Sequence, residues 1–367
     1  MPEPAPRVAY LTSARSWRGS AESFGHIAQG LASAGGHARI FSAARGVTLR
    51  AAALGIPCTE LPVGHTSLRA VARLRRALRE HRIDALIVDK RRDVIHGAAA
   101  AAGLPVALVA RFLFPRWETP RDPLFRGAYR RVDLTNFLTA GAVTHVAAVA
   151  PFLLRRPYVV IHEGVDAARF RPDPAAALAF RRRLGLDDAP VILGVGALEV
   201  EKGYATLVAA VGALPAPRPV VVLVGTGSER DALAAEAAGV EVDLRFAGSL
   251  EAGELPGAYA AATVFAHPSR MEAFGLAVAE AMATGCPVVA AHAGSLPEVV
   301  GDAGVLVPAG DPKALAGALR ALLGDAEERR TLGHRARIRV LEQFGLERME
   351  RAHVDALAAV LARRRPV

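Results

Sequence analysis

The sequence predicts an α/β protein with two doubly wound domains that face each other across a crevice. Short apolar runs alternate with helix-like segments along the whole chain, and several of the runs end in glycine-containing loops. The same alternation restarts near Pro190, which divides the chain into two halves of similar size. Because a strand, a crossover helix and a second strand form a parallel unit, each half should contain one parallel sheet.

The domain boundary is expected at a polar, turn-rich segment, 162–172. We expect an N-terminal Rossmann-like domain over 1–165 and a C-terminal Rossmann-like domain over 166–345. The last segment, 346–367, is predicted to be a C-terminal helix that packs back on the N-terminal domain.

Length and composition fit a folded protein with large cores. The chain has 367 residues, of which 52% are hydrophobic and 22% are charged, which excludes a disordered chain. Two distant cysteines, Cys58 and Cys286, do not indicate a disulfide scaffold or a metal site. The first six residues lack the basic and apolar regions of a signal peptide, and prolines break the longest apolar runs. We therefore expect a cytoplasmic location.

The charge balance is basic, with a net charge of +9, and only three of the 45 basic residues are lysines. Compositional bias of a GC-rich genome explains this arginine excess. The alternative is attraction to an anionic substrate or to an acidic membrane surface, which would place the protein peripherally at the inner face of a membrane. Basic residues are dispersed without interleaved aromatics, so no nucleic acid partner is expected.

In the first half, a buried strand comes first and is followed by a polar loop and a helix that Gly35 and Gly36 close. Short apolar runs predict the other strands, and alanine- or arginine-rich segments predict the helices. The predicted strands are 7–12, 37–42, 85–88, 106–112, 143–149 and 159–161. The predicted helices are 23–34, 68–81, 94–102 and 134–140.

In the second half, a helix precedes a regular succession of strands and helices. The predicted strands are 191–195, 220–225, 244–247, 264–267, 288–290 and 305–307. The predicted helices are 175–184, 204–214, 229–238, 255–261, 276–284 and 312–323. Residues 326–365 are predicted to be helical, with a break near Phe344 and Gly345.

One loop carries the strongest functional signal, because it joins a buried strand to a helix that ends at Gly285. A helix N-terminus binds anions, and Gly275 lets a ligand approach the backbone N–H groups of Gly275 and Leu276. Glu272 lies in the loop and Glu280 lies about one turn into the helix. Carboxylates do not bind phosphate, so these two should hold uncharged groups attached to it, such as sugar hydroxyls. The pattern suggests a nucleotide-sugar ligand.

A second loop follows the first strand of the second half and contains Gly196 and Lys202. Glu199 stands where a dinucleotide fingerprint would have its third glycine, so the loop does not match that motif. Lys202 is one of only three lysines, and its ammonium group would suit a leaving diphosphate. The alternative is an ordinary solvated helix N-terminus.

Other strand-ending loops should open toward the same crevice. Gly225 ends one strand, and Leu250 could contact a base through backbone groups. In the first half, Gly19 could approach phosphates, with Arg15 and Arg18 nearby. The charged run 89–93 contains Lys90 and Arg91 and is either a solvated face or an element that binds acceptor or phosphate. No histidine spacing predicts a metal site, and no Asp-x-Asp metal clamp is present.

These pieces together resemble the family-4 retaining glycosyltransferases of the GT-B fold. The resemblance runs from His162 to about Leu323 and is specific as an ordered set, while the N-terminal half matches only in its strand–helix rhythm and the Gly19 loop. The matching segments are His-Glu-Gly-Val-Asp-Ala-Ala-Arg-Phe-Arg-Pro (162–172), Glu-Lys-Gly (201–203), Val-Gly-Thr-Gly (224–227), Phe-Ala-Gly (246–248), the stretch 268–290 and Leu-Pro-Glu-Val-Val (296–300).

The resemblance implies a role for each matched residue. Lys202 would bind the donor diphosphate, Glu272 the sugar hydroxyls and Glu280 the ribose, and Lys202 and Glu272 would be the catalytic pair. Transfer would retain the anomeric configuration and would need no metal or other cofactor. The full donor-binding set is Gly19, Gly196, Gly225, Leu250, Ser269, Arg270, Phe274, Gly275, Leu276 and Glu280. The acceptor candidates, in the N-terminal domain, are Lys90, Arg91 and Arg111.

Two departures from the family pattern bear on activity. Ala197 occupies the place of an arginine that usually assists the lysine, and Arg270, Arg18 or Lys90 would have to substitute for it. Arg111 stands where many members have a histidine.

The expected function is transfer of a sugar from a nucleoside-diphosphate sugar to a lipid-linked or envelope saccharide, which the basic helix 68–81 would suit.

Several alternatives stay open. One is a catalytically impaired protein that only binds a sugar nucleotide, and another is a glycosyltransferase acting on a small metabolite. A phosphorylase or epimerase would share the fold but should show a cofactor lysine or another crevice pattern. An NAD-dependent dehydrogenase would need a complete glycine fingerprint, which neither half supplies.

Overall fold

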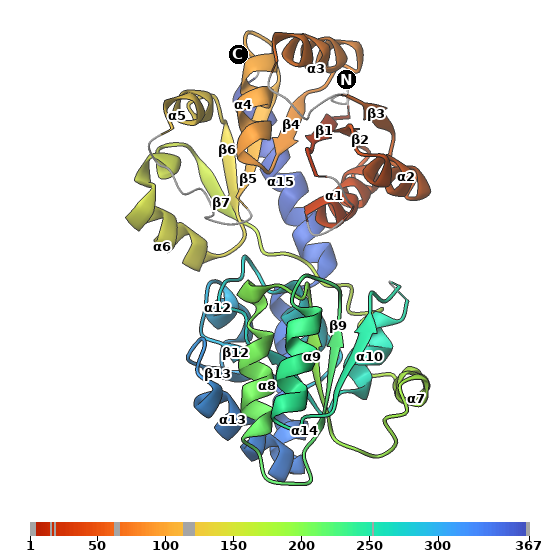
Figure 1. The fold of residues 1–367 in the computed structure, drawn as a ribbon. Coiled ribbons are helices and arrows are strands. Elements are labelled where there is room, and N and C mark those ends of the chain that lie inside the picture. The colour runs from red at the N-terminus through yellow and green to blue at the C-terminus, as the bar shows by residue number, and fades with distance from the viewer. Residues whose placement is uncertain are drawn as a thin grey trace. The chain divides into compact units, whose positions relative to one another are not determined.

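A computed structural model describes residues 5–14, 17, 20–61, 67–112, 122–251 and 253–364. The chain divides into two compact units (Figure 1). The first unit contains Met1–Gly164 together with Leu346–Val367, and the second contains Val165–Gly345. Across the described ranges, no helix is both long enough and apolar enough to span a bilayer.

The first unit is built on a seven-stranded parallel sheet with the order β3-β2-β1-β4-β5-β6-β7. The strand order reverses direction between β1 and β4, which makes this the switch point of a doubly wound sheet. The strands are β1 Arg7–Leu11, β2 His37–Ser42, β3 Cys58–Glu60, β4 Ala85–Val88, β5 Ala107–Phe112, β6 Leu134–Phe137 and β7 Tyr158–Val160.

Helices connect these strands and cover the sheet (Figure 1). Ser67 caps α3 by accepting a hydrogen bond from the backbone N–H of Ala70 at 3.2 Å. The helices are α1 Ser20–Ser33, α2 Arg45–Ala53, α3 Leu68–Glu80, α4 Arg91–Ala100, α5 Pro123–Tyr129, α6 Ala140–Val149, the 3₁₀ helix η1 Pro151–Arg155 and α15 Leu346–Arg364.

Two predictions in this unit were wrong, and they concern neighbouring segments. The predicted helix 134–140 is mostly strand β6, which lies between β5 and β7 and is buried along its whole length. A strand covered on both faces shows no alternation of polar and apolar residues. Its sequence therefore lacks the two-residue period that identifies a strand. The predicted strand 143–149 belongs to helix α6, which begins after Thr139, whose side chain accepts from the N–H of Ala142 at 3.1 Å. Helices α2 and α5, the 3₁₀ helix η1 and strand β3 were not predicted.

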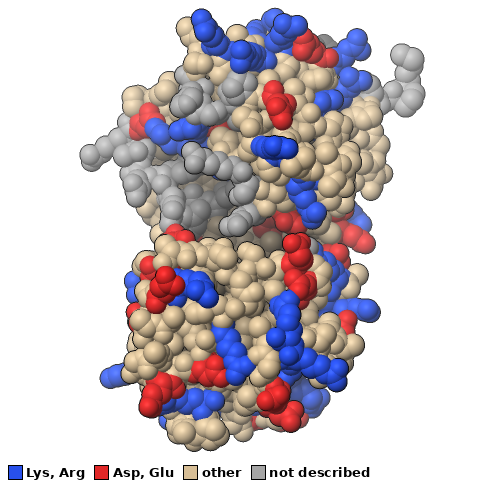
Figure 2. All heavy atoms as spheres, turned by 45° about the vertical axis from the view of Figure 1, so that its right-hand side comes forward, with Lys and Arg blue, Asp and Glu red and all other residues tan. Residues whose placement is uncertain are grey.

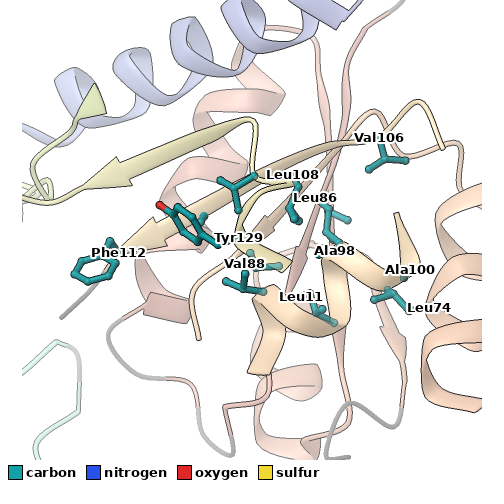
Figure 3. Packing of buried hydrophobic residues seen from close by; sticks show 14 of the residues in the cluster. Leu11, Leu74, Leu86, Val88, Ala98, Ala100, Val106, Leu108, Phe112 and Tyr129 are labelled. Atoms are coloured by element: carbon teal, nitrogen blue, oxygen red, sulfur yellow. The ribbon is translucent and has the colours of Figure 1, made fainter. Parts of the chain in front are cut away.

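The first unit has one core on each face of its sheet. Leu11, Leu86, Val88 and Leu108 point to one face, where they pack with the residues of α3, α4 and α5 that Figure 3 shows. The intervening residues of the same strands belong to the core on the other face. This division follows from the pleat, because successive side chains of a strand point to opposite sides.

Helix α15 returns the end of the chain to the first unit. Its Leu357 and Val360 are buried in the second of these cores. His353 on the same helix is buried, and its Nε2 lies 3.0 Å from Nδ2 of Asn136 on β6. A Cβ at Gly30 of α1 would lie 2.7 Å from Cβ of Glu350, so α1 and α15 pack at a distance that only glycine permits.

The second unit contains a six-stranded parallel sheet with the order β10-β9-β8-β11-β12-β13. Its strands are β8 Val191–Val195, β9 Val220–Val224, β10 Leu244–Gly248, β11 Val264–His267, β12 Val288–Ala291 and β13 Val305–Val307. Its helices are α7 Pro174–Arg183, η2 Val200–Lys202, α8 Tyr204–Gly212, α9 Arg230–Gly239, α10 Leu255–Ala261, α11 Leu276–Ala283, α12 Leu296–Val300, α13 Pro312–Gly324 and α14 Ala326–Gln343. All six strands were predicted, whereas α12 was not.

The switch point of the second sheet lies between β8 and β11, where the strand order reverses. In open α/β sheets, ligands bind outside the carboxyl ends of the strands at such a point. The predicted loops that contain Lys202 and Glu272 follow β8 and β11, respectively. The topology therefore brings the two loops to one edge of the sheet.

Candidate functional site

Three charged or titratable side chains meet at the carboxyl ends of β8 and β11. Nζ of Lys202 donates a hydrogen bond to Oε2 of Glu272 at 2.7 Å, and the two side chains are 22% and 15% exposed. Nε2 of His267, the last residue of β11, lies 2.9 Å from the same oxygen. The structure thus places the two predicted catalytic residues in direct contact and adds a histidine that the sequence interpretation did not include.

The environment of Glu272 keeps its carboxyl group ionised. Burial by itself would raise the pKa of this carboxyl, but the hydrogen bonds from His267 and Lys202 and the positive charge of Lys202 outweigh it and lower the pKa to about 2. A carboxylate is an acceptor without a proton to donate, which suits hydroxyl groups and repels phosphate.

Glu280 lies on α11 and is held by a second buried residue. The hydroxyl of Tyr259 on α10 donates to Oε2 of Glu280 at 2.7 Å. Tyr259 is fully buried, and burial together with the charge of Glu280 raises the pKa of its phenol well above the usual value. The phenol therefore stays protonated and fixes the direction of the carboxylate.

Between these two carboxylates, helix α11 begins at Leu276. Gly275 is its N-cap with φ = 97°, a left-handed conformation that favours glycine, and glycine has no side chain with which to cap the helix. The first N–H groups of a helix have no partner within it and carry the positive end of its dipole. The side chain of Phe274 is buried edge-on against Phe344, with ring centroids 5.5 Å apart, so only its backbone can serve a ligand here.

The predicted glycines position the loops around this helix end. A Cβ at Gly225 would lie 1.9 Å from the carbonyl oxygen of Gly196, so the loops after β8 and β9 touch through their backbones. Ser269 is fully buried, and its hydroxyl donates to the carbonyl oxygens of Met271 and Glu201 at 2.8 and 3.2 Å. The side chain of Ser269 therefore ties the β11 loop to the β8 loop.

The remaining donor-binding candidates lie around the edge. Arg270 is exposed, and its guanidinium makes no hydrogen bond or ion pair with any described residue. Leu250 is half-buried after β10, and Ala197 is exposed in the β8 loop. Arg15, Arg18 and Gly19 lie outside the described residues.

In the first unit, Arg111 does not present its guanidinium to solvent. It is 1% exposed and bonds Oε1 of Glu163 and Oγ of Ser23, each at 2.8 Å, and Ser23 also bonds Glu163. An arginine with these internal partners is a structural element of the unit. The expectation that it is available for an acceptor therefore has no support in this geometry.

The charged run 89–93 also differs from a solvated face. Asp89 and Asp93 are buried, and the hydroxyl of Tyr10 donates to Oδ2 of Asp89 at 2.5 Å. Burial and the charge of Asp89 raise the pKa of Asp93 to about 7. Lys90 is half-buried, and Arg91 is exposed and forms an ion pair with Asp122.

Three residues of the site in the second unit were not predicted from the sequence: His267, Tyr259 and Tyr204. His267 could have been found, because it directly precedes the Pro268 motif at the end of a buried strand. Tyr259 lies 21 residues before Glu280 with no local signal. The buried hydroxyl of Tyr204 has no partner among the described residues, and a Cβ at Gly196 would lie 2.9 Å from it.

Residues 178–339 match the family described as Glycosyl transferases group 1. Over this segment the chain is similar to the group 1 glycosyltransferases. The match covers the loops of Lys202 and Glu272 together with helix α11, and it confirms the resemblance drawn from the motifs.

Two relatives show the same similarity. The chain is 40% identical over 218 residues to a D-inositol 3-phosphate glycosyltransferase of Xylanimonas cellulosilytica, covering 56% of this chain and 52% of that protein. It is 33% identical over 258 residues to a GDP-mannose-dependent alpha-(1-6)-phosphatidylinositol monomannoside mannosyltransferase of Mycobacterium tuberculosis, covering 65% and 64%. The chain thus spans between half and two thirds of the length of these relatives.

Solved structures share the fold over almost the whole chain, among them a glycosyltransferase of Rickettsia africae with a TM-score of 0.86 at 16% identity, covering 97% of this chain and 98% of that one. Anabaena Alr3699/HepE in complex with UDP aligns with a TM-score of 0.84 at 21% identity, covering 96% of this chain and 100% of that one. The same protein in complex with UDP-glucose aligns with a TM-score of 0.82 at 22% identity, over 96% and 99%. These likenesses confirm the prediction of two Rossmann-like domains of the GT-B type.

Proposed function

We propose that this protein is a retaining glycosyltransferase that takes its sugar from a nucleoside-diphosphate sugar. The observation that carries the proposal is the contact of Lys202 and His267 with Glu272 beside the N-terminus of α11, within a group 1 glycosyltransferase domain. The Lys202 cation suits the diphosphate of such a donor, and the ionised carboxylate of Glu272 suits its sugar hydroxyls. The open N-terminus of α11 suits the phosphate that joins the two.

The roles of the residues follow from their chemistry. The Lys202 ammonium would move from Glu272 to the diphosphate and stabilise the charge that develops as the sugar leaves. Glu272 would accept hydrogen bonds from sugar hydroxyls, and the first N–H groups of α11 would bind the phosphate. Glu280, oriented by Tyr259, would accept from the ribose hydroxyls. No metal or other cofactor takes part in this scheme.

The relatives support a nucleotide-sugar donor without fixing its base. The mycobacterial relative is named for GDP-mannose, and the Anabaena protein is solved with UDP and with UDP-glucose. The groups described above would hold diphosphate, sugar and ribose, which these donors share. The thermal-shift screen of nucleotides therefore has to identify the base.

For the acceptor, we favour a lipid-linked or envelope saccharide, with peripheral contact to a membrane surface. Helix α3 supports this, because Arg69, Arg73 and Arg76 are exposed on it and Leu68 is 89% exposed at its start. Figure 2 shows basic side chains gathered at the end of the first unit that carries α3 in Figure 1. Basic residues beside an exposed apolar side chain are typical of helices that lie on acidic lipid surfaces. Acidic vesicles should bind the protein, whereas a small-metabolite acceptor requires no such binding.

A second candidate is a protein that binds a sugar nucleotide but has lost turnover. Ala197 favours it, because an arginine at that position would supply a second cation for the diphosphate. Binding and turnover measured on the same preparation separate the two candidates.

The test compares wild type with Glu280→Ala, and with Glu236→Ala as a control for removing an exposed helical carboxylate in the same unit. UDP, GDP, ADP and their common sugars are screened by thermal shift, in which a ligand at 100 times its dissociation constant adds roughly 2.7 kcal/mol of stability. We expect one base to stabilise wild type and Glu236→Ala but not Glu280→Ala, and we expect that donor to be consumed when acceptor is added. Absence of any nucleotide response in wild type would contradict the proposal, and binding without turnover would favour the second candidate.

A further inference from the structure

His267 is held in one place by the core of the second unit. It ends β11, is 2% exposed, and its ring is stacked on that of Phe265 with an interplanar angle of 17°. From this position its Nε2 reaches Oε2 of Glu272 at 2.9 Å. A buried, stacked ring has few alternative rotamers, so the direction of this hydrogen bond is set by the strand.

The surroundings of the ring indicate which nitrogen carries the proton. Nδ1 is buried and has no hydrogen-bond partner among the described residues. A proton on Nδ1 would be a buried donor without an acceptor, which is costly, whereas a proton on Nε2 is shared with a carboxylate. We therefore assign the Nε2–H tautomer, in which His267 donates to Glu272.

The carboxylate of Glu272 is held on one side only. Lys202 and His267 both bond Oε2, while Oε1 makes no hydrogen bond to any described residue. The backbone of the same residue is also fixed, because its carbonyl oxygen accepts from the N–H of Ser295 at 3.1 Å. This arrangement leaves Oε1 as the oxygen that can accept from a ligand.

Lys202 and His267 cannot have the same role once a donor is bound. The Lys202 ammonium is on a flexible stem and 22% exposed, so an arriving diphosphate can draw it away from Glu272. The buried ring of His267 cannot follow. After that exchange, His267 is the one of the two partners that still bonds the Glu272 side chain.

We propose that His267 is a positioning residue: it holds Oε2 of Glu272 so that Oε1 faces the hydroxyls of the donor sugar, before and after Lys202 moves to the diphosphate. This inference rests on the proposed function of the site. It assigns His267 to recognition of the sugar and not to binding of the nucleotide.

The test uses His267→Phe, which keeps an aromatic ring on Phe265 but removes the donor, and His267→Gln, whose amide N–H₂ can restore it. Affinities are measured by calorimetry for a nucleoside diphosphate and for its sugar conjugate, for example UDP and UDP-glucose, using whichever base wild type binds. We expect His267→Phe to bind the diphosphate as wild type does, but to lose about 10-fold in affinity for the sugar conjugate and about 10- to 100-fold in kcat. His267→Gln should recover most of both losses.

Two results would overturn the inference. One is a His267→Phe protein whose affinities for both ligands and whose kcat equal those of wild type. The other is an equal loss of diphosphate and sugar-conjugate binding in both variants together with a lowered Tm, which a merely structural role would produce. Failure of the proposed function looks different, because wild type itself would then bind neither ligand.

A readout without ligand tests the tautomer directly. In ¹⁵N-histidine spectra of the unliganded protein, the signal that His267→Gln removes should show a protonated Nε2 and an unprotonated Nδ1. Glu272→Gln should shift that Nε2 resonance. An Nδ1–H tautomer would overturn the assignment.

Discussion

Nζ of Lys202 lies 2.7 Å from Oε2 of Glu272, although the two residues are 70 positions apart in the chain. The contact joins the loop after β8 to the loop after β11, at the point where the strand order of the second sheet reverses. In the absence of a donor, the cation and the carboxylate neutralise each other. A bound diphosphate would therefore have to compete with Glu272 for the lysine, and this competition makes the pair testable.

Lys202→Ala should abolish most of the transfer activity. The substitution removes the cation proposed to stabilise the departing diphosphate, and loss of one such donor typically costs about 10²- to 10³-fold in kcat. The measurement is the rate of donor consumption with acceptor present. Lys313→Ala removes an exposed lysine on α13 of the same unit and should leave the rate unchanged. A Lys202→Ala enzyme within about three-fold of wild type would contradict this role.

The contribution of Glu272 to stability should depend on pH in a specific window. Because its pKa is lowered from 4.5 to about 2 in the folded state, its stabilisation is fully present above pH 4.5 and is lost as the pH falls toward 2. The difference in unfolding free energy between wild type and Glu272→Gln, from urea denaturation, should be constant between pH 5 and 8. Below pH 4.5 it should shrink by up to about 1.4 kcal/mol per pH unit. A difference that does not change below pH 4.5 would show that the carboxyl is not coupled to Lys202 and His267.

Gly225→Ala should destabilise the second unit far more than Gly248→Ala. Both glycines end a strand with positive φ, 136° and 68°, so alanine adds backbone strain of about 1–2 kcal/mol at either position. Only at Gly225 would the new Cβ meet a backbone oxygen, 1.9 Å away, while Gly248 has open space around it. Thermal and urea unfolding of both variants measure the difference. Equal losses in the two variants would mean that the contact between the loops after β8 and β9 is easily displaced.

Ala197→Arg should strengthen diphosphate binding. Ala197 is exposed in the β8 loop that also carries Lys202, so a longer side chain can be accommodated without disturbing the core. A second cation at the diphosphate is worth on the order of 2–4 kcal/mol of transition-state stabilisation where it is well placed. We expect at least a several-fold lower Kd for the nucleoside diphosphate by calorimetry, with Ala197→Gln unchanged. If arginine has no effect, another cation already serves that phosphate.

Chelation of metal ions should leave the activity within about two-fold of its starting value. The proposed scheme neutralises the diphosphate with Lys202 and the N-terminus of α11, so a divalent cation has no assigned part in it. The measurement compares rates after dialysis against EDTA and after return of Mg²⁺ or Mn²⁺. A loss greater than 10-fold that one of these ions restores would show that the diphosphate is bound through a metal.

The sequence by itself determined the α/β alternation, all six strands of the second sheet and the candidates Lys202, Glu272 and Glu280. These features are local, because an apolar run signals a buried strand and a glycine marks the turn that follows it. The local pattern gave the wrong element over 134–149. Strand β6 is buried on both faces, so its sequence does not alternate between polar and apolar residues, and the valine-containing segment that follows forms helix α6 after the cap at Thr139.

Only the tertiary structure decided which side chains meet. It paired Glu272 with His267 and Lys202, and Glu280 with Tyr259, and it used Arg111 for an internal ion pair with Glu163. Such pairs depend on the order of strands in the sheet and on the burial around each group. Neither property is encoded within a short stretch of residues. Spacing along the chain therefore identified these charged residues as candidates but could not assign their partners.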